Sequence, residues 1–189
     1  MKRMLLHICC APCSTYVIEV LKPIYKIAGF FYNPNIHPES QYKLRLEEII
    51  RYAEIAGIDL VVGEYEVRRW FDLVRGLEDE PEGGRRCRIC YRMRLERTAQ
   101  YAAEHGFDII TTTLSISPHK KADVINRIGA EVAGKHGVGF LQADFKKKGG
   151  FQKSVIMSKR YNLYRQDYCG CIFSLREAER RRRRRKDGR

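Results

Sequence analysis

The sequence predicts an α/β fold, with a five-stranded parallel sheet covered by helices on both faces in three layers. Short runs of apolar residues alternate with segments of helical period along most of the chain. Parallel neighbouring strands need crossover connections, which those helical segments supply. The 189 residues, 44% of them hydrophobic, are enough for one domain with a core, expected over residues 1–179.

The first half of the chain is expected to contain three strands and three helices. A proline at position 23 ends the first helix, and Pro38 with Glu39 opens the second, which Gly57 stops. In order, the predicted elements are a strand at 4–10, a helix at 14–21, a strand at 27–33, a helix at 38–56, a strand at 58–65 and a helix at 67–77.

The second half continues the alternation after a polar loop at 78–86. A helix is expected over 87–106 with Gly106 as its C-terminal cap, followed by a strand over 107–117. Ser117 and Pro118 are typical of a helix start, which predicts a helix from there to His136. A fifth strand is expected over 138–145.

Ligands of parallel sheets bind at the carboxyl ends of the strands, so the residues that follow the strands are the candidate site. Cys9, Cys10 and Cys13 follow the first strand, the segment "SISPHK" follows the fourth, and Asp144 follows the fifth. No glycine-rich phosphate loop is present, because "CCAPC" occupies the position after the first strand where one would lie. These groups are expected to share one rim.

Seven cysteines form three groups, 9/10/13, 87/90 and 169/171. Their number is odd and no secretion signal precedes them, so a disulfide framework is not expected and the protein is predicted to be cytoplasmic. Clustered thiols in a reducing compartment indicate metal binding or redox chemistry. No apolar run is long enough to span a bilayer, which predicts no membrane partner.

The pair Cys87 and Cys90 forms a CxxC motif at a helix start, where the helix N-terminus and nearby arginines favour thiolate. Together with Cys9 and Cys10 it offers four thiolates to one site. Structural zinc usually takes two CxxC pairs, and adjacent cysteines cannot form such a pair. An iron–sulfur cluster is therefore favoured over zinc, with zinc as the alternative.

Cys169 and Cys171 are separated only by Gly170. A disulfide across one residue closes a small, strained ring that is readily reduced, which favours a redox-active pair. The alternative is that both are further metal ligands. Cys13 is either a ligand of a second, mononuclear metal such as iron or a small residue at a helix start. Asp144 is either a general acid or second-metal ligand, or a helix cap.

The formal net charge is +13, and residues 180–189 contribute eight Arg or Lys and one Asp. This tail is expected to be disordered. Further basic residues surround the cysteine motifs. Because no apolar face accompanies the charge, nucleic acid is the expected partner rather than a membrane.

The segments "HICCAPCS", "CRICYRMRL", "ADFKKKGGFQKS" and "LYRQDYCGCIFS" resemble the cobalamin-independent epoxyqueuosine reductases, the QueH family. The resemblance covers most of the chain except the arginine-rich tail. It implies a Rossmann-like fold of the nucleotide alpha-hydrolase type. It also implies reduction of epoxyqueuosine to queuosine at the wobble position of tRNA, the last step of queuosine biosynthesis, with electrons from an external donor.

The same resemblance implies roles for six cysteines. Cys9, Cys10, Cys87 and Cys90 correspond to the ligands of a [4Fe-4S] cluster, and Cys169 and Cys171 to the redox-active pair. Two other functions remain open on the residues alone. A thiol-dependent tRNA modification enzyme would need an ATP-binding loop that this chain lacks. A zinc-stabilised tRNA-binding module would explain the charge and most cysteines, but not the closely spaced pair at 169 and 171.

Overall fold

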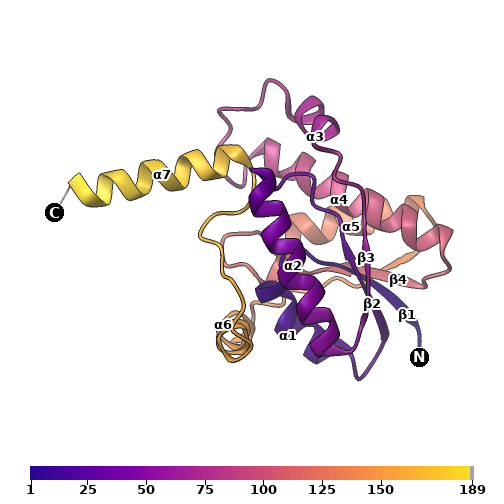
Figure 1. The fold of residues 1–189 in the computed structure, drawn as a ribbon. Helices are drawn as coiled ribbons and strands as arrows, with labels where there is room; N and C mark the ends of the chain where they lie inside the picture. Colours follow the sequence, from indigo (N-terminus) through magenta and orange to yellow (C-terminus); the bar gives the residue numbers. More distant parts are fainter. Residues whose placement is uncertain (188–189) are drawn as a thin grey trace.

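The computed structural model describes residues 1–187 and contains one five-stranded parallel sheet (Figure 1). The strand order is β3-β2-β1-β4-β5, and every neighbouring pair is parallel. The predicted fold class is therefore confirmed. The strands are β1 (Arg3–His7), β2 (Lys26–Phe31), β3 (Asp59–Val62), β4 (Ile109–Thr112) and β5 (Gly139–Phe140).

Helices cover both faces of the sheet. The helices α3, α4 and α5 pack on one face, while α1 and α2 pack on the other and α6 packs on α1. None of the described helices is long and apolar enough to cross a membrane. The helices are α1 (Ala11–Leu21), α2 (Glu39–Ala56), α3 (Val67–Val74), α4 (Arg85–Glu104), η1 (Thr113–Ile116, a 3-10 helix), α5 (Ala122–Lys135), α6 (Gly150–Arg160) and α7 (Ile172–Asp187).

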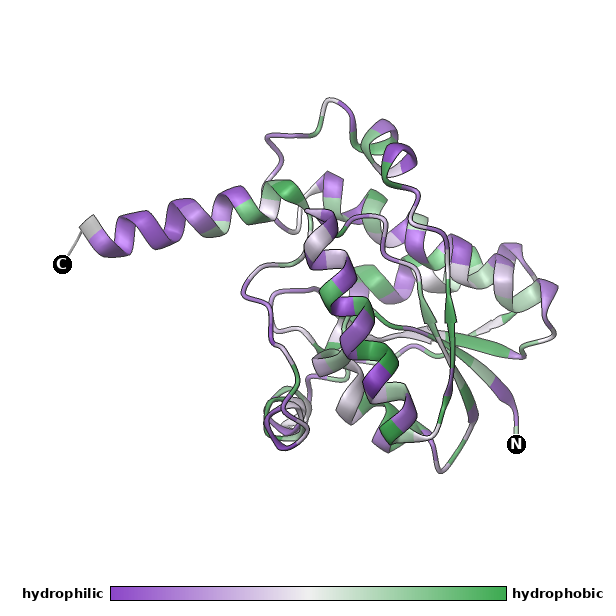
Figure 2. Cartoon of the chain, viewed as in Figure 1, coloured by the Kyte–Doolittle hydropathy of each residue, from purple (hydrophilic) through white to green (hydrophobic). Residues whose placement is uncertain are grey.

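The central strand β1 contributes side chains to two hydrophobic cores, because successive side chains point to opposite faces of the sheet. Leu5 packs with the helices α3, α4 and α5, whereas Met4 and Leu6 pack with α1 and α2. Figure 2 shows the same arrangement as apolar strands between helices whose outer faces are polar. His7, at the end of β1, is fully buried and bonds through Nδ1 to Thr112 Oγ1 at 2.9 Å, so it belongs to the core as its apolar neighbours suggest.

Several boundaries differ from the sequence prediction: β1 ends at His7, α1 begins at Ala11 and β5 spans only Gly139–Phe140. Two further differences lie beside the site. The segment 107–117 contains the short strand β4 followed by η1, rather than one long strand. Helix α5 begins at Ala122 instead of Ser117, because Ser117 starts a separate turn. Its carbonyl accepts the Lys120 N–H at 3.2 Å, and its hydroxyl accepts the His119 N–H at 3.3 Å. That turn carries residues 117–120 onto the rim of the site.

Residues 180–187 form the end of α7 rather than the disordered tail that we expected. The helix projects from the body of the protein (Figure 1). Arginine has a high helix propensity, so a run of arginines continues a helix that has already been started. The last two positions of the expected tail, 188 and 189, lie outside the described residues.

The packing of α6 on α1 predicts that Gly150→Ala destabilises the protein. A Cβ at Gly150 would overlap the Phe145 carbonyl oxygen and lie 2.7 Å from the ring of Tyr16. Backbone must move to relieve such overlap, at a cost of about 1–3 kcal/mol in the free energy of unfolding. Urea unfolding followed by circular dichroism measures it. The control is Gly134→Ala, at an exposed position of α5 where a Cβ meets nothing within 4 Å. It should stabilise by up to about 1 kcal/mol, and equal effects of the two changes would contradict the packing argument.

Candidate active site

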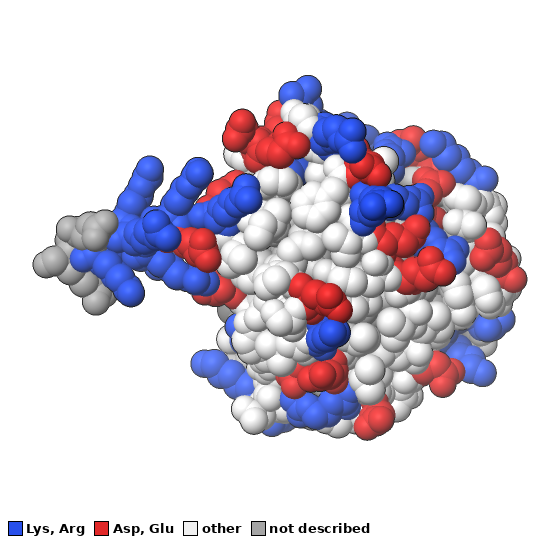
Figure 3. All heavy atoms as spheres, turned by 45° about the horizontal axis from the view of Figure 1, so that its top comes forward, with Lys and Arg blue, Asp and Glu red and all other residues white. Residues whose placement is uncertain are grey.

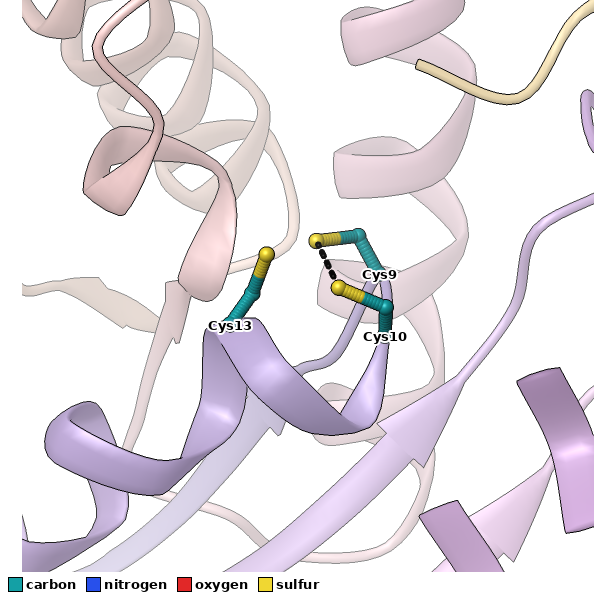
Figure 4. A group of neighbouring side chains, drawn as sticks. All are labelled: Cys9, Cys10 and Cys13. Carbon is teal, nitrogen blue, oxygen red and sulfur yellow. Dashed lines mark hydrogen bonds between the residues drawn. The ribbon is translucent and has the colours of Figure 1, made fainter. Parts of the chain in front are cut away.

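The first thiol group lies where β1 ends and α1 begins. Cys10 is the N-terminal cap residue of α1, with an extended backbone, and Cys13 lies on the first turn. The Sγ atoms of Cys9, Cys10 and Cys13 all lie within 4.8 Å of one another (Figure 4). The structure therefore brings Cys13 close to Cys9 and Cys10. The spacing in the sequence did not decide whether Cys13 belongs to this group.

Cys9 is the acidic member of this group. Hydrogen bonds from the thiols of Cys10 and Cys13 hold the pKa of Cys9 well below its usual range. Burial raises the pKa of Cys10 to about 12. Thr113 of η1 contacts Cys9 twice. Its Oγ1 lies 3.2 Å from Cys9 Sγ and accepts the Cys9 backbone N–H at 3.1 Å. The ends of β1 and β4 thus meet at this sulfur.

The second thiol group comes from α4 and from the segment before α7. Cys87 and Cys90 lie on the first turns of α4 and are buried. They line one small pocket together with Cys169 and Cys171. Cys87 Sγ accepts the Gly83 N–H at 3.2 Å, while burial raises the pKa of this thiol to about 12.

The loop that holds Cys169 and Cys171 is fixed mainly through its backbone. Arg45 of α2 is 2% exposed; its Nη1 donates to the Cys169 carbonyl at 3.1 Å. The His37 N–H donates to the Gly170 carbonyl at 2.8 Å. Gly170 has a φ of 149°, and a Cβ there would lie 3.2 Å from Arg45 Nη1, so the position requires glycine.

Cys171 also starts α7. Its carbonyl accepts the Leu175 N–H at 3.0 Å and its Sγ accepts the Ser174 N–H at 3.3 Å. A side chain that accepts from the third helical residue satisfies one of the free N–H groups at the helix start. The buried thiol of the pair is therefore part of the capping structure of α7.

Arg94 of α4 lies between the two thiol groups. It is 1% exposed; its Nε donates to the Cys90 carbonyl at 3.2 Å and its Nη1 to Asn33 Oδ1 at 3.4 Å. Its Nη2 has no hydrogen-bond partner within residues 1–187. Burial opposes the charge, yet the thiols of Cys90, Cys169 and Cys9 together raise the pKa of Arg94. The guanidinium is thus a fixed positive charge among sulfur atoms.

A larger cavity of about 560 Å³ opens beside these groups. Cys9, Cys13, Cys169 and Arg94 line its inner part. Cys169 lines both this cavity and the small pocket of Cys87 and Cys90. A substrate in the larger cavity would therefore meet sulfur from both groups.

Asp144 does not line either of these cavities. It lies in a neighbouring cleft that shares the segment 118–120 with the larger cavity, and its Oδ1 accepts from Lys146 Nζ at 2.7 Å. It does not cap α6, whose N-terminal cap residue is Gly149. A role for Asp144 as an acid or metal ligand stays a prediction.

Sequence reasoning did not assign Arg45 and Arg94 to the site. The spacing of Cys87, Cys90 and Arg94, at i, i+3 and i+7, places all three on one face of α4, and that spacing was the available signal. No comparable signal exists for Arg45, because it is 124 residues from the carbonyl that it holds.

The epoxyqueuosine reductase QueH family matches residues 4–177 of this chain. The chain belongs to that family. A QueH from Histophilus somni is 45% identical over 177 residues, which are 93% of this chain and 73% of the relative. A QueH from Thermotoga maritima is 40% identical over 183 residues, which are 94% of this chain and 92% of the relative.

A solved structure with a similar fold is the U34-tRNA thiolase NcsA from Methanococcus maripaludis, determined with its [4Fe-4S] cluster. The TM-score is 0.58 at 11% identity, and the match covers 92% of this chain and 61% of the thiolase. At this identity the likeness concerns the fold, and it agrees with the Rossmann-like architecture expected for QueH proteins.

The contacts of Arg45 predict that Arg45→Met exposes the cysteine pair. Without the bond to the Cys169 carbonyl, the loop at 169–171 should open more often, and alkylation of the buried Cys171 should accelerate at least about tenfold. Mass spectrometry after timed alkylation measures the rate. The matched control, Lys43→Met on the exposed face of α2, removes only an ion pair with Glu39. Equal rates in the two variants would show that Arg45 does not hold the loop.

Proposed function

We propose that this protein is an epoxyqueuosine reductase, which reduces epoxyqueuosine to queuosine at the wobble position of tRNA. The observation that carries the proposal is that Cys169 lines both the cavity of Cys9 and Cys13 and the adjoining pocket of Cys87 and Cys90, in a chain that belongs to the QueH family. Because Cys169 lines the cavity, a base held there would lie against the partly exposed member of the proposed redox pair.

Within this proposal, Cys9, Cys10, Cys87 and Cys90 hold a [4Fe-4S] cluster. The site fits such a group, because a thiolate-ligated cluster is anionic and Arg94 offers a buried cation with an unpartnered Nη2. Trp70 also lines the pocket of Cys87 and Cys90, where its indole opposes the effect of burial, which raises the pKa of the Cys90 thiol. When bound, the cluster supplies electron transfer at a potential set by such nearby donors and charges.

The cysteine pair matches the demand of the reaction. Converting an epoxide to an alkene releases its oxygen as water and consumes two electrons and two protons. Two thiols that join as one disulfide release two electrons and two protons, so Cys169 and Cys171 balance one turnover. Cys169 lines the cavity and is partly exposed, while Cys171 is buried. An external donor must then reduce the disulfide before the next turnover.

Cys13 is the remaining thiol in contact with Cys9 and Cys10. We propose it as a ligand of a second, mononuclear iron beside the cluster, since it lines the cavity and is partly exposed. With both protons available from the cysteine pair, the reaction as written needs no separate carboxylic acid. Asp144 lies in its own cleft, and its role as an acid or second-metal ligand stays a prediction.

The ligand assignment predicts opposite results for two cysteine variants. Cys87→Ala should lose most of the iron and sulfide of the cluster, because one of its four ligands is gone. Cys13→Ala should keep four iron and matching sulfide per chain and lose only additional iron. Metal and sulfide analysis of anaerobically purified protein measures both. If Cys13→Ala loses the cluster and Cys87→Ala keeps it, the triad of Cys9, Cys10 and Cys13 holds it instead.

The redox assignment predicts that replacing Cys169 and Cys171 with Ser leaves the cluster in place and stops turnover. The assay is anaerobic, with epoxyqueuosine-containing tRNA and a chemical reductant, and nucleoside mass analysis detects queuosine. The unaltered protein should form queuosine, and failure to do so would refute the proposed function. Turnover by the double Ser variant would instead leave the function standing and remove the pair from the mechanism. Stoichiometric zinc in place of iron would favour a binding module.

A further inference from the structure

The arginine-rich helix α7 has one face toward the cavity. Ala178, Arg181, Arg182 and Arg185 line the cavity that also contains Cys9 and Cys169. Their spacing of three, four and seven residues places them on one side of the helix. We call this side of the helix, with Arg181, Arg182 and Arg185, the inner face. The arginines at 180, 183 and 184 form the outer face and do not line the cavity.

The sequence alone does not distinguish these two faces. Six consecutive arginines have no periodicity, and Figure 3 shows basic side chains extending to both sides of α7 in that view. The inner face is also oriented by a contact, because Arg182 donates to a carboxylate oxygen of Asp167, in the segment just before the cysteine pair. Residues 178–187 lie beyond the residues that the QueH family model matches.

The rim of the cavity is strongly cationic. Besides the inner face it carries Lys120 and Arg165, whereas its acidic residues are Glu82 and Asp167. The guanidinium of Arg165 lies 5.9 Å from the centre of the Phe151 ring, which also lines the rim. Cations beside an aromatic ring are the combination with which proteins bind single-stranded nucleic acid, through phosphates and stacked bases.

We propose that the inner face of α7 binds backbone phosphates of the single-stranded RNA loop whose base enters the cavity. The proposal rests on the proposed function for the identity of the substrate. A base that reaches the thiols must leave its stack, and its flanking phosphates then remain at the rim. The inner face stands at that rim. A membrane surface does not suit α7, because its exposed part has no apolar side (Figure 2).

The test compares two triple variants with the same change in charge. One replaces Arg181, Arg182 and Arg185 with Gln, and the other replaces Arg180, Arg183 and Arg184 with Gln. Glutamine and arginine have similar helix propensities, so α7 should persist in both. Circular dichroism and iron content check that each variant is folded and loaded. Affinity for an anticodon stem–loop RNA is measured at several salt concentrations.

The inner-face variant should bind the stem–loop at least about tenfold more weakly. The slope of log affinity against log salt should also fall by about 2, because three phosphate contacts are lost at about 0.7 each. The outer-face variant should stay within about threefold of the unaltered protein, with its slope nearly unchanged. A blunt RNA duplex of the same length should show no difference between the variants.

Equal losses in the two variants would overturn the proposal, because α7 would then attract RNA without a preferred face. An unchanged salt slope in the inner-face variant would overturn it as well. If the unaltered protein does not reduce epoxyqueuosine in tRNA, the proposed reaction fails, and the binding comparison still decides whether the inner face contacts an RNA loop.

Discussion

The site depends on the burial of the Arg94 guanidinium among thiols. A buried charge is costly unless it is paired, and among residues 1–186 no carboxylate forms an ion pair with Arg94. Its surroundings contain the thiols of Cys90, Cys169 and Cys9, which together raise the pKa of the Arg94 guanidinium against the effect of burial. Because Arg94 shares a helix face with Cys87 and Cys90, the position of α4 fixes both the sulfur atoms and the charge that opposes theirs. This face of α4, with two thiols and a buried cation, suits the binding of an anionic group that sulfur atoms ligate.

The sheet topology explains why distant segments meet there. The chain leaves β1 for β2 on one side of the sheet and returns to the other side at β4, which places a topological switch between β1 and β4. Loops diverge at such a point and leave room for ligands. Cys9 follows β1 and Thr113 follows β4, and the two side chains are in contact at 3.2 Å. Helix α4 packs on the sheet face that carries Leu5 and supplies Cys87 and Cys90 of the second thiol group.

The fold and most of the cysteine rim were predictable from sequence, because buried strands, helix caps and clustered thiols leave strong local patterns. The start of α5 was not, since Ser117 and Pro118 carry a helix-start pattern while the Ser117 hydroxyl caps a separate turn. The sequence also did not show which thiols lie near one another. Only the structure shows that Cys13 lies beside Cys9 and that Cys169 lines both the cavity and the small pocket. The position of Asp144 after the fifth strand also did not show which cleft its side chain lines.

Helix α7 connects the chemistry of the site with its charge. Its first residues are capped by Cys171 and its last turn is basic, an order that suits the helix dipole, positive at the N-terminus and negative at the C-terminus. Six adjacent arginines still repel one another, and within the described residues the ion pairs of 180–186 include only that of Arg182 with Asp167. A polyanion at the inner face would relieve this repulsion. If the inner face binds the RNA loop as proposed, the helix is expected to gain stability from that RNA.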